Sequence, residues 1–95
     1  MTSLLLALAI QATASKYYVE LNWIQSRTPG ITGNCIYRAR RGAPLRKLAC
    51  VEPPIIKYKD TRVKDGETYR YAVTAVEGEE ESHYSNKIVV KIPDD

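Results

Sequence analysis

The feature that most constrains this chain is a strict alternation of side chains over residues 67–76, just after a turn at Gly66. One parity carries Tyr69, Tyr71, Val73 and Ala75. A hydrophobic period of two predicts a β-strand with one face toward a core. No stretch of the chain shows a helical period, so an all-β protein is expected.

Other segments of the same period suggest a complete sheet architecture. They are residues 1–14, 18–23, 35–40, 45–50, 55–60 and 86–92. Gly42, Pro44 and the Pro53-Pro54 pair interrupt the pattern between them. Seven strands at roughly regular spacing predict a seven-stranded antiparallel β-sandwich. Its expected core is Val19, Leu21, Trp23, Ile36, Tyr69, Tyr71, Val73, Ile88 and Val90. The 95 residues are one domain's worth, 1–95.

The first segment is unusually apolar. Its hydrophobic side chains, on both parities, include Leu4, Leu5, Leu6, Leu8 and Ile10. As a first strand, 1–14 would bury one parity and expose an apolar stripe, which a partner would have to cover. A cleaved signal segment and a frayed terminus are the alternatives. The run is too short to span a bilayer.

Charge is distributed unevenly along the chain, although the net charge is only +3. Residues 34–64 hold nine Lys or Arg and two acidic residues, whereas 65–95 hold three and eight. The candidate interface residues are Arg38, Arg40, Arg41, Arg46 and Lys47 in the first part and Glu79, Glu80 and Glu81 in the second. Solvated loop tips are the alternative. Nucleic-acid binding is not expected, because exposed aromatic residues are few among the basic ones.

Cys35 and Cys50 match no zinc-ligand spacing and are either one disulfide or two free thiols. They flank a hairpin near Gly42 at about equal distance. If Ile36 and Leu48 both face inward, however, the two cysteines point to opposite faces, and a bridge requires a bulge.

Motifs of catalysis are absent from the sequence. It contains no Gly-x-Ser-x-Gly, no phosphate-binding glycine loop and no His-Glu-x-x-His. His83 lies in no metal-ligand pattern. We therefore expect no enzymatic activity and no cofactor or metal.

Five short motifs, in order, resemble a fibronectin type III domain of the bacterial and phage kind, an immunoglobulin-like sandwich, over residues 8–93. They are Trp23; Ile36-Tyr37-Arg38; Asp60-Thr61; Val63, Gly66 and Tyr69; and Glu81-Ser82 with Ser85-Asn86. The resemblance implies a tyrosine corner, in which the Tyr69 hydroxyl supplies a hydrogen bond to a backbone acceptor upstream. Trp23, Val63, Gly66 and Asp60 are then structural. Asn34 departs from the family, which usually has tyrosine there, and the integrin-binding Arg-Gly-Asp is absent.

Two functions remain open at this point. The first is a structural module that docks onto copies of itself or onto a larger particle, such as a virion or surface layer. The second is a spacer, adhesion or carbohydrate-associated domain of a secreted bacterial protein. Either implies protein partners or a homo-oligomer and an extracellular, virion or cell-surface location, with the cytoplasm as an alternative.

Overall fold

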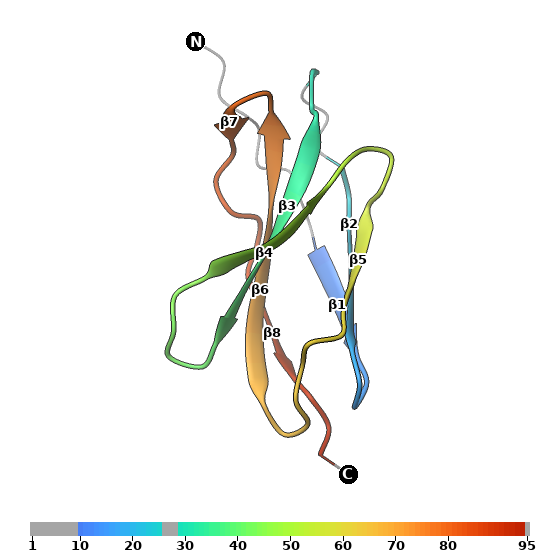
Figure 1. Cartoon of the computed structure of the whole chain (residues 1–95), viewed down its shortest axis with the longest axis vertical. Coiled ribbons are helices and arrows are strands. Elements are labelled where there is room, and N and C mark those ends of the chain that lie inside the picture. Colours follow the sequence, from blue (N-terminus) through green and yellow to red (C-terminus); the bar gives the residue numbers. More distant parts are fainter. Residues whose placement is uncertain (1–9, 26–28, 95) are drawn as a thin grey trace.

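The computed structural model describes residues 10–25 and 29–94, which form two antiparallel sheets packed face to face (Figure 1). The smaller sheet has the order β1 (Ile10–Ala14), β2 (Val19–Trp23) and β5 (Lys57–Asp60). The larger sheet has the order β4 (Arg46–Val51), β3 (Gly33–Arg40) and β6 (Thr68–Glu77). Both β7 (Glu80–Glu81) and β8 (Ile88–Lys91) pair with β6. Leu4, Leu5, Leu6 and Leu8 lie outside the described residues.

Over the described residues the sandwich has eight strands rather than the expected seven, because residues 80–81, outside the expected strands, form β7 on the same edge of β6 as β8. Between β7 and β8 the backbone N–H groups of Ser82 and Ser85 donate to the carbonyls of Ala75 and Val73, both at 2.8 Å. In return, the two serine hydroxyls accept the N–H groups of Ala75 and Val73, both at 2.9 Å. Serine side chains therefore take the place of ladder carbonyls, and the edge of β6 stays satisfied where regular pairing stops.

The core confirms the inner face expected from the alternation. Tyr69, Tyr71, Val73 and Ala75 are all at most 1% exposed. All residues of the expected core are buried except Ile88, which is only partly buried. Ile92, which was not expected in the core, is also buried in it. Ile10 is 4% exposed and packs in the same cluster, so the expectation that it contributes to an adhesive surface is wrong. In the described residues no helix is long and apolar enough to cross a membrane.

The tyrosine corner is present, with the hydrogen bond in the opposite direction from that expected. The backbone N–H of Lys64 donates to the hydroxyl oxygen of Tyr69 at 3.0 Å. Gly66 makes this geometry possible because its φ of 80° is a conformation that other residues rarely adopt. Val63 packs against the core beneath the turn.

Replacing Tyr69 with phenylalanine is expected to lower the free energy of unfolding by about 1–3 kcal/mol, because the Lys64 N–H loses its acceptor. Urea unfolding of Tyr69→Phe measures the loss. Tyr17→Phe is the matched control, since Tyr17 is 73% exposed. Equal stabilities for the two variants would refute this role for the hydroxyl.

Candidate interaction surfaces

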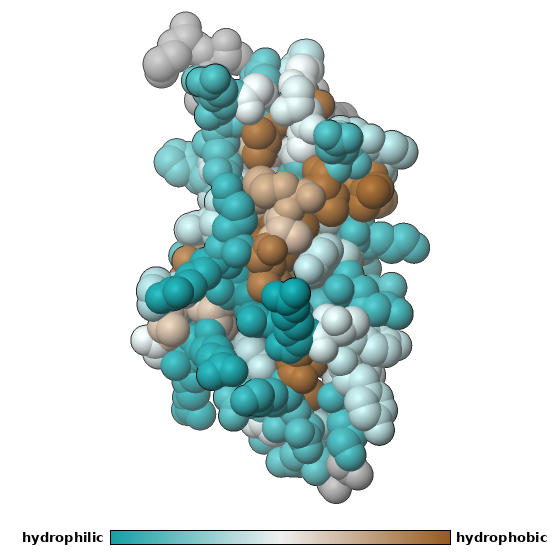
Figure 2. Space-filling model, in the orientation of Figure 1, coloured by the Kyte–Doolittle hydropathy of each residue, from teal (hydrophilic) through white to brown (hydrophobic). Residues whose placement is uncertain are grey.

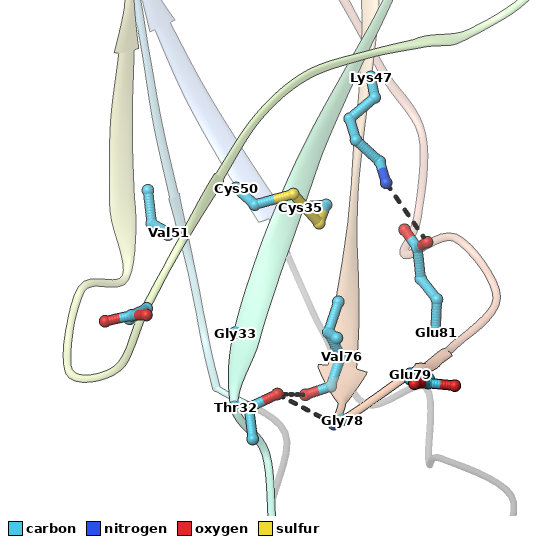
Figure 3. Close-up of a pocket in the computed structure, with 11 residues that line it drawn as sticks. Thr32, Gly33, Cys35, Lys47, Cys50, Val51, Val76, Gly78, Glu79 and Glu81 are labelled. Atoms are coloured by element: carbon cyan, nitrogen blue, oxygen red, sulfur yellow. Dashed lines mark hydrogen bonds and ion pairs between the residues drawn. A yellow bond between two sulfur atoms is a disulfide. The ribbon is translucent and has the colours of Figure 1, made fainter.

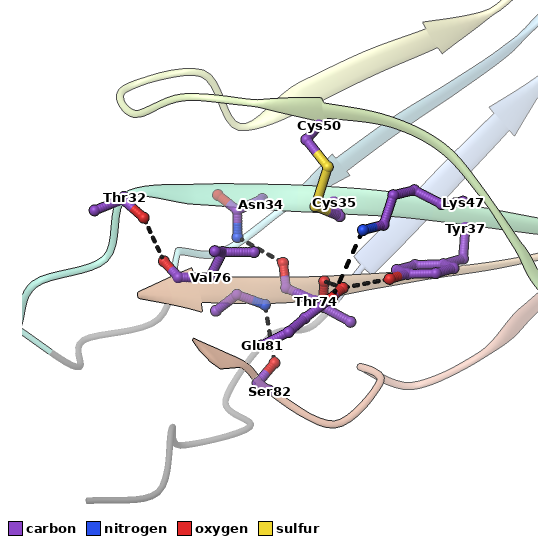
Figure 4. Close-up of a disulfide and its surroundings, with 11 residues drawn as sticks. Thr32, Asn34, Cys35, Tyr37, Lys47, Cys50, Thr74, Val76, Glu81 and Ser82 are labelled. Atoms are coloured by element: carbon purple, nitrogen blue, oxygen red, sulfur yellow. Dashed lines mark hydrogen bonds and ion pairs between the residues drawn. A yellow bond between two sulfur atoms is a disulfide. The ribbon is translucent and has the colours of Figure 1, made fainter. Parts of the chain in front are cut away.

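Cys35 and Cys50 form a disulfide across β3 and β4 on the outer face of the larger sheet (Figure 4). They are direct partners in the register, and a bulge follows: Ile36 pairs with Ala49, but Tyr37 pairs with Lys47. Leu48 is the extra residue. The bulge resolves the parity objection, because it lets Leu48 pack toward the core while Cys50 stays on the side of Cys35.

Beside the disulfide, three side chains meet at the carboxylate of Glu81 (Figure 4); we call Tyr37, Lys47, Thr74 and Glu81 the Glu81 cluster. The Thr74 hydroxyl donates to Glu81 Oε2 at 2.6 Å, and the Tyr37 hydroxyl donates to the same oxygen. The ammonium of Lys47 lies 3.8 Å from Glu81 Oε1. Lys47 and Glu81, both expected as candidate interface residues, therefore contact each other within the chain.

The Glu81 cluster changes the acidity of its members. Partial burial alone would raise the pKa of Glu81, but the hydrogen bonds from Thr74 and Tyr37 and the charge of Lys47 outweigh it, so that this pKa falls below its usual value. Burial, followed by the bond to Glu81, raises the pKa of Tyr37. These two shifts favour the ionised carboxylate of Glu81 and the neutral phenol of Tyr37.

The lowered Glu81 pKa predicts a dependence of stability on pH. Because the folded pKa is below the unfolded one, about 4.3, the contribution is present above pH about 4.3 and disappears as pH falls through the folded pKa. Glu81→Gln should remove this contribution, so the free energy of unfolding of the variant should fall less steeply below pH about 5 than that of wild type. The difference should be about 0.2–1 kcal/mol, because the pair is largely exposed. Urea unfolding from pH 7 to 3 measures this, with Glu79→Gln as control. Parallel curves for wild type and Glu81→Gln would contradict it.

One end of the molecule carries carboxylates beside hydrophobic side chains, and we call it the acidic end. Its carboxylates are Glu52, Glu77, Glu79 and Glu80, and its hydrophobic residues are Ile24, Ile55 and Ile56. The β6–β7 turn carries Glu77, Glu79 and Glu80. A groove of about 440 Å³ beside it is lined by Glu52, Glu79, Glu81 and Lys47, near the disulfide (Figure 3). No group of three His, Cys, Asp or Glu in the described residues could hold a metal ion.

Exposed hydrophobic side chains accompany these carboxylates. Ile24, Ile55 and Ile56 are 66%, 48% and 43% exposed. The bond from the Trp23 N–H to the Ile56 carbonyl, 3.0 Å, joins the two segments that carry them. Gly33, at the start of β3, pairs with Val76 near the end of β6. A Cβ on Gly33 would meet the Val51 carbonyl at 3.0 Å, so the end of β4 lies close to Gly33. The loop after β4 therefore begins at the acidic end. Figure 2 shows hydrophobic atoms on the side where that loop lies and in a broken stripe down the middle of an otherwise hydrophilic face.

The β3–β4 hairpin is basic and points toward the other end of the larger sheet, since Arg40 pairs with Tyr69 at the start of β6 (Figure 1). Arg40, Arg41 and Arg46 are exposed. A pocket of about 460 Å³ opens on this hairpin. It is lined by Arg38, Ala39, Arg40, Ala43, Pro44, Arg46, Lys47 and Leu48.

Arg38 is anchored through one guanidinium nitrogen by acceptors of the protein itself. Its Nη1 lies 2.9 Å from Asp60 Oδ2 and donates to the Arg62 carbonyl at 3.0 Å. Asp60, 1% exposed, also accepts the Tyr71 hydroxyl at 2.6 Å and the Arg62 N–H at 3.1 Å. Burial, and then the bond to Asp60, raise the pKa of Tyr71. This cluster joins β3, β5 and β6 across the two sheets.

Asn34 shows how the departure from the family pattern is accommodated. Its side chain is fully buried and exchanges two hydrogen bonds with the Gln25 amide, at 2.8 and 3.1 Å, and donates to the Thr74 carbonyl at 3.1 Å. Sequence reasoning missed both this amide pair and the Glu81 cluster, because neither has a periodic signature.

No protein-family model matches the chain, and no curated protein matches it either. Solved structures do. An Fn3-like protein from Clostridium thermocellum is 26% identical with a TM-score of 0.70, covering 92% of this chain and 95% of that one. The chicken CNTN1 FN1-FN3 domains are 13% identical with a TM-score of 0.82, over 90% of this chain. This chain has the fibronectin type III fold.

That fibronectin type III fold also occurs within larger proteins. A β-1,2-glucanase from Parabacteroides distasonis is 27% identical with a TM-score of 0.79 over 92% of this chain. This chain spans only 13% of the glucanase and 29% of the CNTN1 fragment. The fold is therefore found both as nearly a whole chain and as a part of longer chains.

Proposed function

We propose that this chain is a non-catalytic extracellular module that associates end to end with copies of itself, the acidic end of one against the basic hairpin of the next. One observation carries the proposal: the exposed arginines of the β3–β4 hairpin and the glutamates of the β6–β7 turn lie at opposite ends of the larger sheet. The disulfide supports an extracellular setting, because such bonds persist in oxidising compartments.

The two charged regions are too far apart to neutralise each other. The register places Arg40 opposite Tyr69, while Glu77 ends the same strand. Those eight steps along a strand cover about 26 Å. Charges this far apart are screened from each other, since the Debye length is about 8–10 Å at moderate ionic strength. Each region is thus available to a neighbouring molecule.

Charge would orient the copies, and apolar surface would hold them. Exposed ion pairs contribute only about 0–1 kcal/mol each. The exposed side chains of Ile24, Ile55 and Ile56 at the acidic end supply apolar area, and Val89, 67% exposed, lines a pocket with Arg41 at the basic end. A head-to-tail contact of this kind repeats into rings or filaments.

Sedimentation velocity over a range of concentrations tests the proposal. The wild-type protein should associate as its concentration rises, more strongly at low than at high salt. Arg40→Glu/Arg41→Glu should weaken association at least tenfold. The control Lys57→Glu/Arg62→Glu makes the same charge change elsewhere and should behave as wild type. A wild-type protein that stays monomeric at high concentration in both salts would leave the spacer function instead.

A second candidate is an accessory domain of a polysaccharide-acting enzyme. The observations that favour it are the 27% identity with a segment of the β-1,2-glucanase and a likeness, at 17% identity and a TM-score of 0.76, to part of a pectate lyase from Erwinia chrysanthemi. Affinity electrophoresis in gels containing β-1,2-glucan or polygalacturonate tests it. Retarded migration of a monomeric wild-type protein would support this candidate, and unchanged migration in both gels would reject it.

A further inference from the structure

The β3–β4 hairpin contains an electrostatic conflict that the folded chain does not resolve. Arg46 and Arg38 are direct partners in the antiparallel register. Like charges directly opposite each other destabilise a strand pair. Asp60 compensates Arg38, but no carboxylate of the described residues lies within ion-pair distance of Arg40 or Arg46. Such local conflicts are expected at functional sites.

The pocket beside this pair has the composition of an anion site. Its four charged lining residues are Arg38, Arg40, Arg46 and Lys47, and it includes no acidic residue. Asp60 and Glu81, the carboxylates that pair with Arg38 and Lys47, do not line the pocket. The remaining lining includes Leu48 and Pro44, whose apolar atoms lower the local dielectric and strengthen attraction to an anion.

The arginines also have donors to spare. The bonds of Arg38 to Asp60 and Arg62 both use Nη1, which leaves other N–H groups of its guanidinium. Arg46 and Arg40 are exposed. Guanidinium groups present a fork of N–H donors that fits carboxylate, sulfate and phosphate oxygens in pairs.

We propose that this pocket binds an oxyanion, a carboxylate or a sulfate group, with Arg46 as its principal donor and Arg40 and Arg38 beside it. The bound anion neutralises the opposed arginines, so binding stabilises the folded protein. The site does not depend on self-association. Its ligand is either a free anion or a carboxylate from the acidic end of a second copy.

Thermal unfolding of dilute, monomeric protein tests the site. Sodium sulfate should raise the wild-type Tm by about 2–4 °C over sodium chloride at equal ionic strength, and sodium acetate tests the carboxylate in the same way. Arg46→Gln should lose this increment while remaining at least as stable as wild type in chloride, because the repulsion is gone. Arg41→Gln, on the same hairpin outside the pocket, should keep it. Equal increments in both variants, or none in wild type, would overturn the site.

Sedimentation of Arg46→Gln then identifies the source of the anion. If association weakens and sulfate competes with it in wild type, the carboxylate comes from a second copy. If association is unchanged while the sulfate increment is lost, the pocket serves a free anion. A monomeric wild-type protein that keeps the sulfate increment would end the end-to-end proposal and leave the site standing.

Discussion

Replacing Asp60 with alanine is expected to lower the free energy of unfolding by about 3–5 kcal/mol, because it removes one partner of a buried ion pair and leaves Arg38 uncompensated between the sheets. The same change removes the acceptor of the Tyr71 hydroxyl and of the Arg62 N–H. Small domains have a total stability of about 5–15 kcal/mol, so Asp60→Ala should be marginally folded.

Urea unfolding of Asp60→Ala beside Tyr71→Phe separates the contributions. Tyr71→Phe deletes only one hydrogen bond to Asp60 and should cost about 1–2 kcal/mol. An Asp60→Ala variant no less stable than Tyr71→Phe would show that the Arg38 pair contributes nothing, contrary to the position of Asp60 at the junction of three strands.

Removing the disulfide is expected to have the next largest effect. The two cysteines are 15 residues apart in sequence, and closing a loop of that length stabilises a fold by about 3 kcal/mol in the chain-entropy model. Cys35→Ala/Cys50→Ala should lose that amount in urea unfolding. Wild-type protein in excess reductant is the companion measurement. A double variant as stable as the oxidised wild type would refute a structural role for the bridge.

The strands of the sandwich could be predicted from the sequence because burial of one face of a strand produces a hydrophobic period of two. The alternation over residues 67–76 is confirmed as β6, and its inner parity is the centre of the core. The tyrosine corner followed from Val63, Gly66 and Tyr69, since the turn requires a positive φ at the glycine. Only the direction of its hydrogen bond was wrong.

Features that depend on single side chains produce no such period. Between β7 and β8 the hydroxyls of Ser82 and Ser85 accept backbone N–H groups of β6, and this leaves the hydrophobic period unchanged. The bulge at Leu48 shifts the register of β3 and β4 by one residue, and no residue spacing in the sequence predicts where this shift occurs.

The sequence predicts either a solvated tip or an interface for the three consecutive glutamates, Glu79, Glu80 and Glu81. Pairing of β7 with β6 instead separates them, because Glu81 turns onto Thr74 and Tyr37 while Glu79 remains at the acidic end. The extent of the domain over 1–95, the absence of catalysis and the role of Leu4 to Leu8 stay predictions.

Mixing two charge-reversed variants tests the end-to-end account most directly. Arg40→Glu/Arg41→Glu keeps a normal acidic end, and Glu79→Lys/Glu80→Lys keeps a normal basic hairpin. Each should be largely monomeric alone, whereas an equimolar mixture should associate, because the acidic end of the first variant can meet the basic hairpin of the second. A mixture that stays monomeric at concentrations where wild type associates would contradict the proposed contact.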